Sequence, residues 1–190
     1  MKKLLSIILS FIAVLMIHCN SEAADIQKAD LNIDGICLDQ PIAEIFARYG
    51  QPAEVKHGTP NGRICIFKMN GGKLRVYATS TGKDGSVYGV HITGDTGLAT
   101  KTGIRVGSTA EKVVDIYGGK VPDSNTEARN AGIEGAVRAI GYAAKLEHDY
   151  RYNPAYGYMD YGECFITLTF YLDENNKVIG ISFWREYMDC

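Results

Sequence analysis

Hydrophobic residues recur at helical spacing in two short segments of the chain. The first set is Ile42, Ile45, Phe46 and Tyr49, and the second is Ala110, Val113, Val114 and Tyr117. In both sets the spacing is i, i+3, i+4, i+7, which gathers apolar side chains into one stripe of an amphipathic helix. The pattern predicts helices over residues 41–49 and 109–117.

The residues that flank these segments predict where each helix begins and ends. Pro41 suits a first turn, where its missing N–H has no helical partner, and Ser108 with Glu111 has the spacing of a capping box. Gly50 and Gly118 supply the left-handed residue that commonly ends a helix.

After each helix the hydrophobic period changes to two, which is typical of half-buried antiparallel strands. Alternation predicts strands near 74–79, 87–93, 166–172 and 178–184, and less regular ones at 63–69 and within 150–161. One face of each strand would lie under a helix. We call the opposite side the outer face, and it would carry Arg75, Tyr77, His91, Thr93, Thr167, Thr169, Tyr171, Ser182 and Trp184.

The chain also carries an internal repeat. Gly35–Gly50 aligns without gaps on Gly103–Gly118 at an offset of 68. We therefore expect an α+β fold of two tandem helix-plus-antiparallel-meander repeats, with repeat 1 over 24–99, repeat 2 over 100–190 and an insertion at about 123–149 that could hold an extra helix. The sequence leaves open whether the two repeats share one continuous sheet.

The first residues have the pattern of a secretory signal peptide. Lys2 and Lys3 precede an apolar run from Leu4 to Ile17, and a small-residue site at Ala23 predicts cleavage of residues 1–23. The run is too short to cross a hydrocarbon core of about 30 Å as a helix, so we expect no transmembrane segment in the mature chain. Lipidation of Cys19 is the disfavoured alternative, because His18 is larger than the residue that a lipoprotein signal carries there.

Composition and charge limit the kind of partner, and the expected export affects how the cysteines are interpreted. Hydrophobic residues make up 46% of the chain and its formal charge is −2, with no basic block of the kind that binds nucleic acid. Cys37, Cys65, Cys164 and Cys190 would meet an oxidising compartment, where disulfides are the default. Of the three complete pairings we favour Cys37–Cys65 with Cys164–Cys190, and four separate core thiols are the alternative.

A tyrosine-rich segment lies between the two parts of repeat 2. It runs from Tyr142 to Tyr161 and includes Tyr150, Tyr152, Tyr156, Tyr158 and Tyr161. Rigid rings with polar tips suit an adaptable recognition surface or stacking on sugars. Alternatively, some of these rings pack inward as ordinary core residues.

Catalytic patterns are sparse. We find no glycine-rich phosphate loop, no nucleophile-elbow serine and no histidine pair at metal spacing. Cys164 and His148 could form a thiol–imidazole pair. Residues 30–35 resemble the start of a calcium loop, but Pro41 stands where the bidentate carboxylate is needed. We expect no metal and no cofactor.

The order of glycine, small polar cap, amphipathic helix, Tyr-Gly, proline and meander resembles the repeat of β-lactamase inhibitor proteins and SmpA/OmlA outer-membrane lipoproteins. The resemblance covers about residues 31–190. It implies sheets that join into a curved surface, and exported proteins that bind other proteins without catalysis. No inhibitory loop matches residue by residue, so no functional residue is transferred.

We therefore expect an exported, non-catalytic module that binds another exported or envelope protein. It would act as an interaction or inhibitor-like module through its outer face. The residues expected to carry it are Arg75, Tyr77, His91, Thr169, Tyr171 and Trp184. The alternative is a carbohydrate- or small-ligand-binding module, or a cysteine-dependent hydrolase, that uses the tyrosine-rich segment.

Overall fold

The computed structural model describes residues 26–59, 62–79, 85–122, 133–153 and 158–188. The predicted signal peptide, Cys19, Tyr156 and Cys190 lie outside these residues. Within the described part of the chain, no helix combines the length and the apolar character needed to cross a bilayer.

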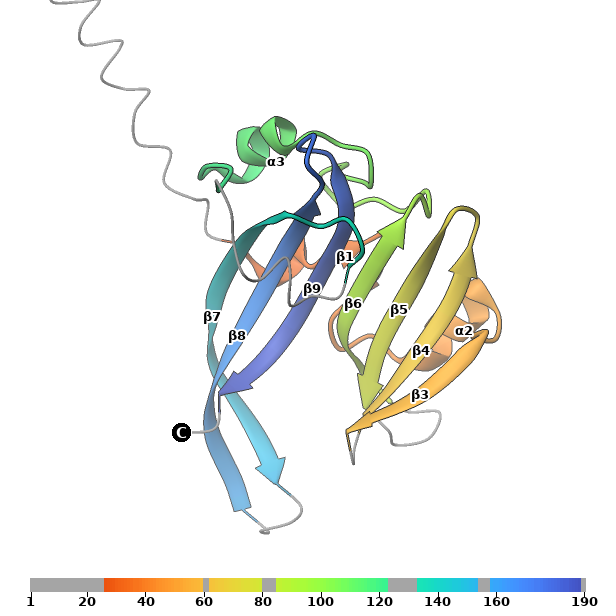
Figure 1. The fold of residues 1–190 in the computed structure, drawn as a ribbon. Helices are drawn as coiled ribbons and strands as arrows, with labels where there is room; N and C mark the ends of the chain where they lie inside the picture. Colours follow the sequence, from red (N-terminus) through yellow and green to blue (C-terminus); the bar gives the residue numbers. More distant parts are fainter. Residues whose placement is uncertain (1–25, 60–61, 80–84, 123–132, 154–157, 189–190) are drawn as a thin grey trace, which may run out of the picture.

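The main body of the fold is one antiparallel sheet of seven strands (Figure 1). Its strands are β3 (Glu54–Thr59), β4 (Gly62–Met69), β5 (Gly72–Thr79), β6 (Val87–Gly94), β7 (Arg138–Asn153), β8 (Tyr158–Leu172) and β9 (Val178–Met188). Their order across the sheet is β3-β4-β5-β6-β9-β8-β7. The sheet is continuous because β6 and β9, each the last strand of its half, pair side by side with Val90 opposite Phe183.

Two helices accompany the sheet, α2 (Ile42–Tyr49) and α3 (Ala110–Tyr117). Both lie where the hydrophobic spacing predicts them, and both end at a glycine of positive φ, Gly50 and Gly118. The expected Ser108–Glu111 capping box is wrong. Thr109 is the N-cap and its side chain accepts the Lys112 N–H, because Ser108 instead accepts a hydrogen bond from the Arg105 N–H.

Each helix begins beside the first residues of the last strand of its half. Three hydrogen bonds join α2 and its preceding residues to the start of β6: Ile42 N–H to Gly85 O (2.7 Å), Asp39 N–H to Val87 O (2.8 Å) and Val87 N–H to Gln40 O (2.9 Å). In the same order, the corresponding bonds at α3 and β9 are Ala110 N–H to Asn176 O (2.9 Å), Gly107 N–H to Val178 O (2.7 Å) and Val178 N–H to Ser108 O (2.9 Å). The two helices are therefore joined to the sheet by the same set of backbone contacts.

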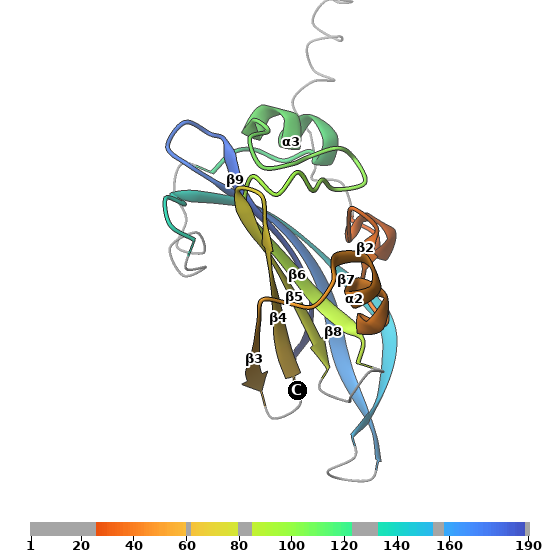
Figure 2. The same cartoon turned by 90° about the vertical axis from the view of Figure 1, so that its right-hand side faces the viewer.

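The core lies between the helices and one face of the sheet. A row of inward residues crosses six strands through Phe67, Leu74, Ile92, Ile181, Phe170 and Ile140. On this face Phe46 and Tyr49 of α2 pack on Phe67, with ring centroids 6.2 and 6.1 Å apart, and Tyr117 of α3 packs on Phe170 at 5.4 Å. Figure 2 shows α2 and β2 (Ile36–Cys37), which pairs with β1 (Asn32–Ile33), on one side of the sheet.

Two helix tyrosines take matching roles in this core. Tyr117 is buried and its hydroxyl lies 2.8 Å from the Thr102 hydroxyl. Tyr49 is half-buried and donates to a carboxylate oxygen of Asp34 at 3.2 Å. In each case the partner lies fifteen residues earlier in the chain.

Two expectations about strands need correction. β7 begins at Arg138, inside the stretch assigned to an insertion, so residues 138–146 form an edge strand and not a helix. Pairing with β8 along the whole of this segment outweighs the helical preference of its alanines. β3 is an additional edge strand that the alternation did not predict, because Val55 is its one large apolar residue.

The predicted Cys37–Cys65 disulfide is wrong. Both residues are free thiols. Cys65 is fully buried at mid-strand in β4, whereas the Cys37 sulfur faces Asn32 and accepts its side-chain N–H at 3.1 Å. The side chain of Cys164 and the whole of Cys190 lie outside the described residues, so their pairing stays a prediction.

Candidate binding face

The strand register places all nine predicted outer-face residues on the same side of the sheet. Residues that are direct partners in neighbouring strands point to the same face. Three rows cross the sheet in this way: Tyr77, Gly89, Trp184 and Thr167; then Arg75, His91, Ser182 and Thr169; then Lys73, Thr93, Gly180 and Tyr171. The face is formed by β5 and β6 from one half of the chain and β9 and β8 from the other.

The centre of the outer face is more enclosed than the sequence predicts. His91 and Ser182 are direct partners, and only 7% and 1% of their surfaces are exposed. The Ser182 hydroxyl lies 3.2 Å from the Tyr171 hydroxyl, and the His91 ring packs 5.8 Å from the Tyr171 ring. A place on the outer face therefore does not make these two residues accessible to water.

His91 is uncharged near neutral pH. Burial lowers its pKa to about 4, and the neighbouring Arg75 charge contributes in the same direction. Its Nε2 has no hydrogen-bond partner among the described residues. A neutral imidazole can serve here as a hydrogen-bonding group, but it adds no positive charge to the face.

One end of the outer face carries an aromatic patch, which we define as Tyr77, Tyr88 and Trp184. The Tyr77 ring centroid lies 4.2 Å from that of Trp184 and 6.2 Å from that of Tyr88. All three side chains are half-buried. Burial raises the pKa of Tyr77 and of Tyr88, so both hydroxyls stay protonated at neutral pH.

Gly89 makes room for this patch. A Cβ built on Gly89 would lie 2.8 Å from Trp184 Cζ3 and closer still to Cε3. The indole therefore lies directly against the backbone of β6. Neither Gly89 nor Tyr88 stands out in the alternation of β6, because the close packing of this glycine on Trp184 follows only from the register of β6 and β9.

The other end of the outer face carries a cationic patch, which we define as Lys68, Lys73 and Arg75. Lys68 is the direct partner of Lys73 in β4, and Arg75 follows two residues along β5. None of the three forms an ion pair with another residue in the described ranges, whereas nearby Lys56 pairs with Glu54 at 3.4 Å. Sequence reasoning identified Arg75 alone, although Lys73 shares its alternation in β5.

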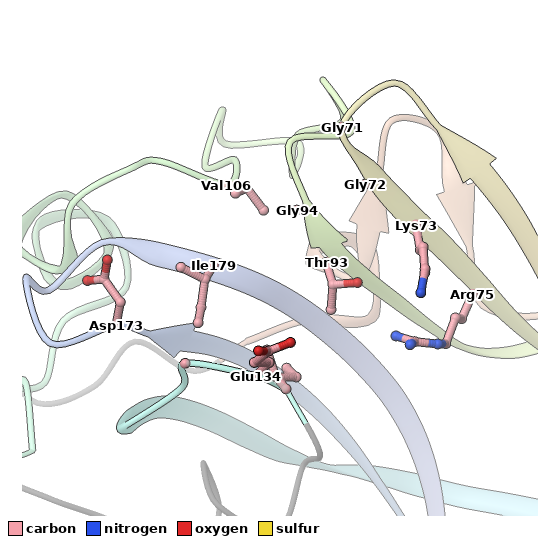
Figure 3. Close-up of a pocket in the computed structure, with 12 residues that line it drawn as sticks. Gly71, Gly72, Lys73, Arg75, Thr93, Gly94, Val106, Glu134, Asp173 and Ile179 are labelled. Carbon is pink, nitrogen blue, oxygen red and sulfur yellow. The ribbon is translucent and has the colours of Figure 1, made fainter.

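A cleft of about 720 Å³ opens beside the cationic patch. Figure 3 shows Lys73 and Arg75 on one side of it, Thr93 between, and Ile179, Glu134 and Asp173 on the other. A second hollow of about 310 Å³ lies over β3–β5 and shares Lys73 and Arg75 with the first. The two cationic side chains thus form a ridge between neighbouring hollows.

A third hollow, of about 420 Å³, lies over β7 and β8. It reaches Thr167 and Thr169 of the outer face and small residues of β7 such as Gly141. The outer face is therefore contoured by side chains from both halves of the chain.

The tyrosine-rich segment lies away from the cationic patch. Its first residue, Tyr142, lies opposite Leu168 in the body of the sheet, where it is buried and its hydroxyl donates a hydrogen bond to Gly118 O at 2.9 Å. Residues 149–153 and 158–162 form the far part of the β7–β8 hairpin, in which Tyr150 is opposite Tyr161, Tyr152 opposite Met159, and Asn153 opposite Tyr158. Figure 1 shows this hairpin extending beyond the other strands. The directions of these tyrosine side chains lie outside what the structure describes, as does the proposed Cys164–His148 contact.

No protein-family model matches the sequence, and no curated protein matches it. Among solved structures, a cysteine-rich secretory protein from Staphylococcus aureus subsp. aureus Mu50 is 14% identical with a TM-score of 0.49, and the match covers 87% of this chain and 49% of that one. An extracellular protein containing an SCP domain from Bacillus anthracis str. Ames is 8% identical with a TM-score of 0.47, covering 90% and 55%.

A DUF4309 family protein from Bacillus subtilis subsp. subtilis str. 168 is 13% identical with a TM-score of 0.41, covering 80% of this chain and 84% of that one. The chain spans about half the length of the first two proteins. None of the three is described as a β-lactamase-inhibitor-like or SmpA/OmlA-like protein.

Proposed function

We propose that this chain is an exported, non-catalytic binding protein that holds another exported or envelope protein against the outer face of its sheet. The observation that carries the proposal is the meeting, on one face, of the aromatic patch and the cationic patch. Tyr, Trp and Arg are enriched where proteins contact one another, because they combine large contact area with polar groups. The signal-peptide pattern of residues 1–23 supports export.

The proposal includes a duplicated architecture. The hydrogen bonds that join α2 to β6 and α3 to β9 occur at helix positions 68 residues apart, and they support two copies of one helix-and-meander unit. The matching hydroxyl contacts of Tyr49 and Tyr117 support it further. On this reading the chain resembles β-lactamase inhibitor proteins and SmpA/OmlA lipoproteins, and the pairing of β6 with β9 creates a face wider than one copy could offer.

Site-specific photo-crosslinking tests the proposed function. A photoreactive residue at Thr169 or Lys73 samples the outer face, and the same residue at Ile116, an exposed position of α3, is the matched control. The proteins are incubated with envelope extract or culture fluid of the source, and the crosslinked protein is identified, purified and tested for direct binding. We expect capture from the outer face alone, and loss of direct binding in Trp184→Ala.

Equal crosslinking from Ile116, or retained binding by both Trp184→Ala and Tyr171→Ala, would contradict the proposed face. The 720 Å³ cleft falls in the size range of small-ligand sites, so a carbohydrate is the alternative ligand. A glycan array tests it with Arg75→Ala, because Arg75 lines this cleft. A glycan that binds tightly and depends on Arg75, with no crosslinked protein, would replace the protein-binding proposal.

A further inference from the structure

The aromatic and cationic patches meet along one strand. Tyr77, Arg75 and Lys73 occupy alternate positions of β5 and point to the outer face. Alternate residues of a strand are separated by about 6.7 Å, so the three side chains are spaced along roughly 13 Å. An extended peptide has the same spacing between its own alternate side chains.

We propose that the outer face binds an extended acidic peptide segment of the partner protein that lies along β5 and presents an aromatic residue and two carboxylates at alternate positions. The aromatic residue contacts the patch of Tyr77, Tyr88 and Trp184, and the carboxylates contact Arg75 and Lys73. This inference rests on the proposed function and names the chemistry of the partner at the same face.

The charges of the face favour a carboxylate-bearing segment. Arg75 is half-buried, and a guanidinium in such a place pairs with a carboxylate through two parallel hydrogen bonds. Neither Arg75 nor Lys73 has a carboxylate partner within the described ranges, so a ligand can supply one without breaking an existing pair.

The surrounding acidic residues disfavour a polyanion. Glu134 and Asp173 line the far side of the larger cleft, whereas Glu54 in the smaller hollow already pairs with Lys56. A phosphate polymer or nucleic acid in the larger cleft would bring negative charge against Glu134 and Asp173. A peptide with carboxylates confined to the ridge of Lys73 and Arg75 avoids that repulsion.

Fluorescence anisotropy with four labelled heptapeptides tests the spacing. The probe is GWSESEG, and GESESWG carries the same residues in the reverse direction. GWEESSG keeps the composition but destroys the alternation, and GWSKSKG reverses the charge. We expect one of the first two peptides to bind about tenfold more tightly than either of the last two, and to weaken as salt is added.

Charge-reversal variants of the whole chain test the residues. Lys73→Glu and Arg75→Glu should each weaken the favoured peptide about tenfold and strengthen GWSKSKG. Lys112→Glu makes the same charge change on exposed α3 and should change affinity less than about twofold. Because Lys73 is exposed, its variant should fold normally, and circular dichroism confirms the fold of each protein.

Equal binding of GWSESEG, GESESWG and GWEESSG would overturn the inference, as would an equal loss in Lys112→Glu. Tighter binding of inorganic tripolyphosphate than of every peptide would also overturn it in favour of a phosphate ligand. If a crosslinked partner binds the outer face and loses affinity in Trp184→Ala but not in Lys73→Glu or Arg75→Glu, the acidic-peptide inference fails while the proposed function stands. Peptide binding with no crosslinked partner would contradict the proposed function, and with it the assignment of the peptide to a partner protein, while the acidic-peptide chemistry of the face would stand.

Discussion

Replacing Gly89 by Ala tests the packing that holds the aromatic patch together. The added Cβ would lie 2.8 Å from Trp184 Cζ3 and closer still to Cε3, so the indole or β6 has to move. Overpacking of this kind costs about 1–3 kcal/mol. Against this, Ala is favoured over Gly inside a strand by about 0.5–1 kcal/mol, because an alanine loses less conformational freedom than a glycine when the chain folds.

The two effects separate in a double-mutant cycle. With Trp184 present, Gly89→Ala should lower the free energy of unfolding by about 0.5–2 kcal/mol. In a Trp184→Ala background the overlap is gone, and the same substitution should raise the free energy of unfolding by about 0.5 kcal/mol. The interaction energy between the two positions is therefore about 1–2.5 kcal/mol. Urea unfolding followed by circular dichroism measures all four proteins.

Gly180→Ala is the matched control in this experiment. Gly180 lies in the neighbouring strand, and its added Cβ would meet Ile133 at 3.0 Å with no Trp184 atom among its nearest neighbours. Its effect should be the same with and without Trp184. Trp184 is the only tryptophan of the chain, so its emission spectrum reports the displacement directly. An effect of Gly89→Ala that does not depend on Trp184 would refute the packing argument.

Three further predictions concern titration and thiol chemistry. Burial lowers the pKa of His91 from 6.5 to about 4, so the contribution of the neutral imidazole to stability is complete above about pH 6.5 and is lost as the pH falls toward 4. The free energy of unfolding should fall by at most about 1.4 kcal/mol per pH unit in this range. His91→Gln should remove this pH dependence in urea unfolding, and an unchanged dependence in the variant would contradict the assignment. Burial raises the pKa of Asp39, but hydrogen bonds from Arg185 and Lys28 outweigh this effect and hold the pKa below 3.8. Because the Asp39 side chain is 43% exposed, Asp39→Asn should lower the free energy of unfolding by only about 0.5–1 kcal/mol at pH 7. This difference from wild type should vanish in acid below the lowered pKa. Alkylation of the folded protein should modify Cys37 and leave buried Cys65 unmodified until the chain unfolds, as measured by peptide mass spectrometry. Recovery of a Cys37–Cys65 disulfide would show that the free-thiol assignment is wrong.

Local patterns in the sequence predicted the parts of the fold that depend on neighbours in the chain. The helical spacing of Ile42 and Ile45 places α2 correctly because one turn brings these side chains to the same stripe. The alternation in β5 likewise places Arg75 and Tyr77 on one face.

Features that depend on distant segments were missed. Nothing in the period of β6 or β9 says that they are neighbours, because their pairing is a contact between residues about ninety positions apart. The burial of His91 depends on the side chains that flank it from β5, β8 and β9, and not on its own strand. The polar strand β3 escaped detection because an edge strand buries little of its own surface.

The joining of β6 to β9 has a consequence for how the chain reaches its native state. β9 is the last of the seven strands to be synthesised, so the apolar strand β6 has an unpaired backbone edge until residues 178–188 have been made. Such an edge is a template for pairing with other chains, and a contact of this sequence separation forms slowly. The nascent protein is thus most prone to aggregate just before its final strand arrives, and a holding chaperone that shields β6 during that interval would raise the yield of folded protein.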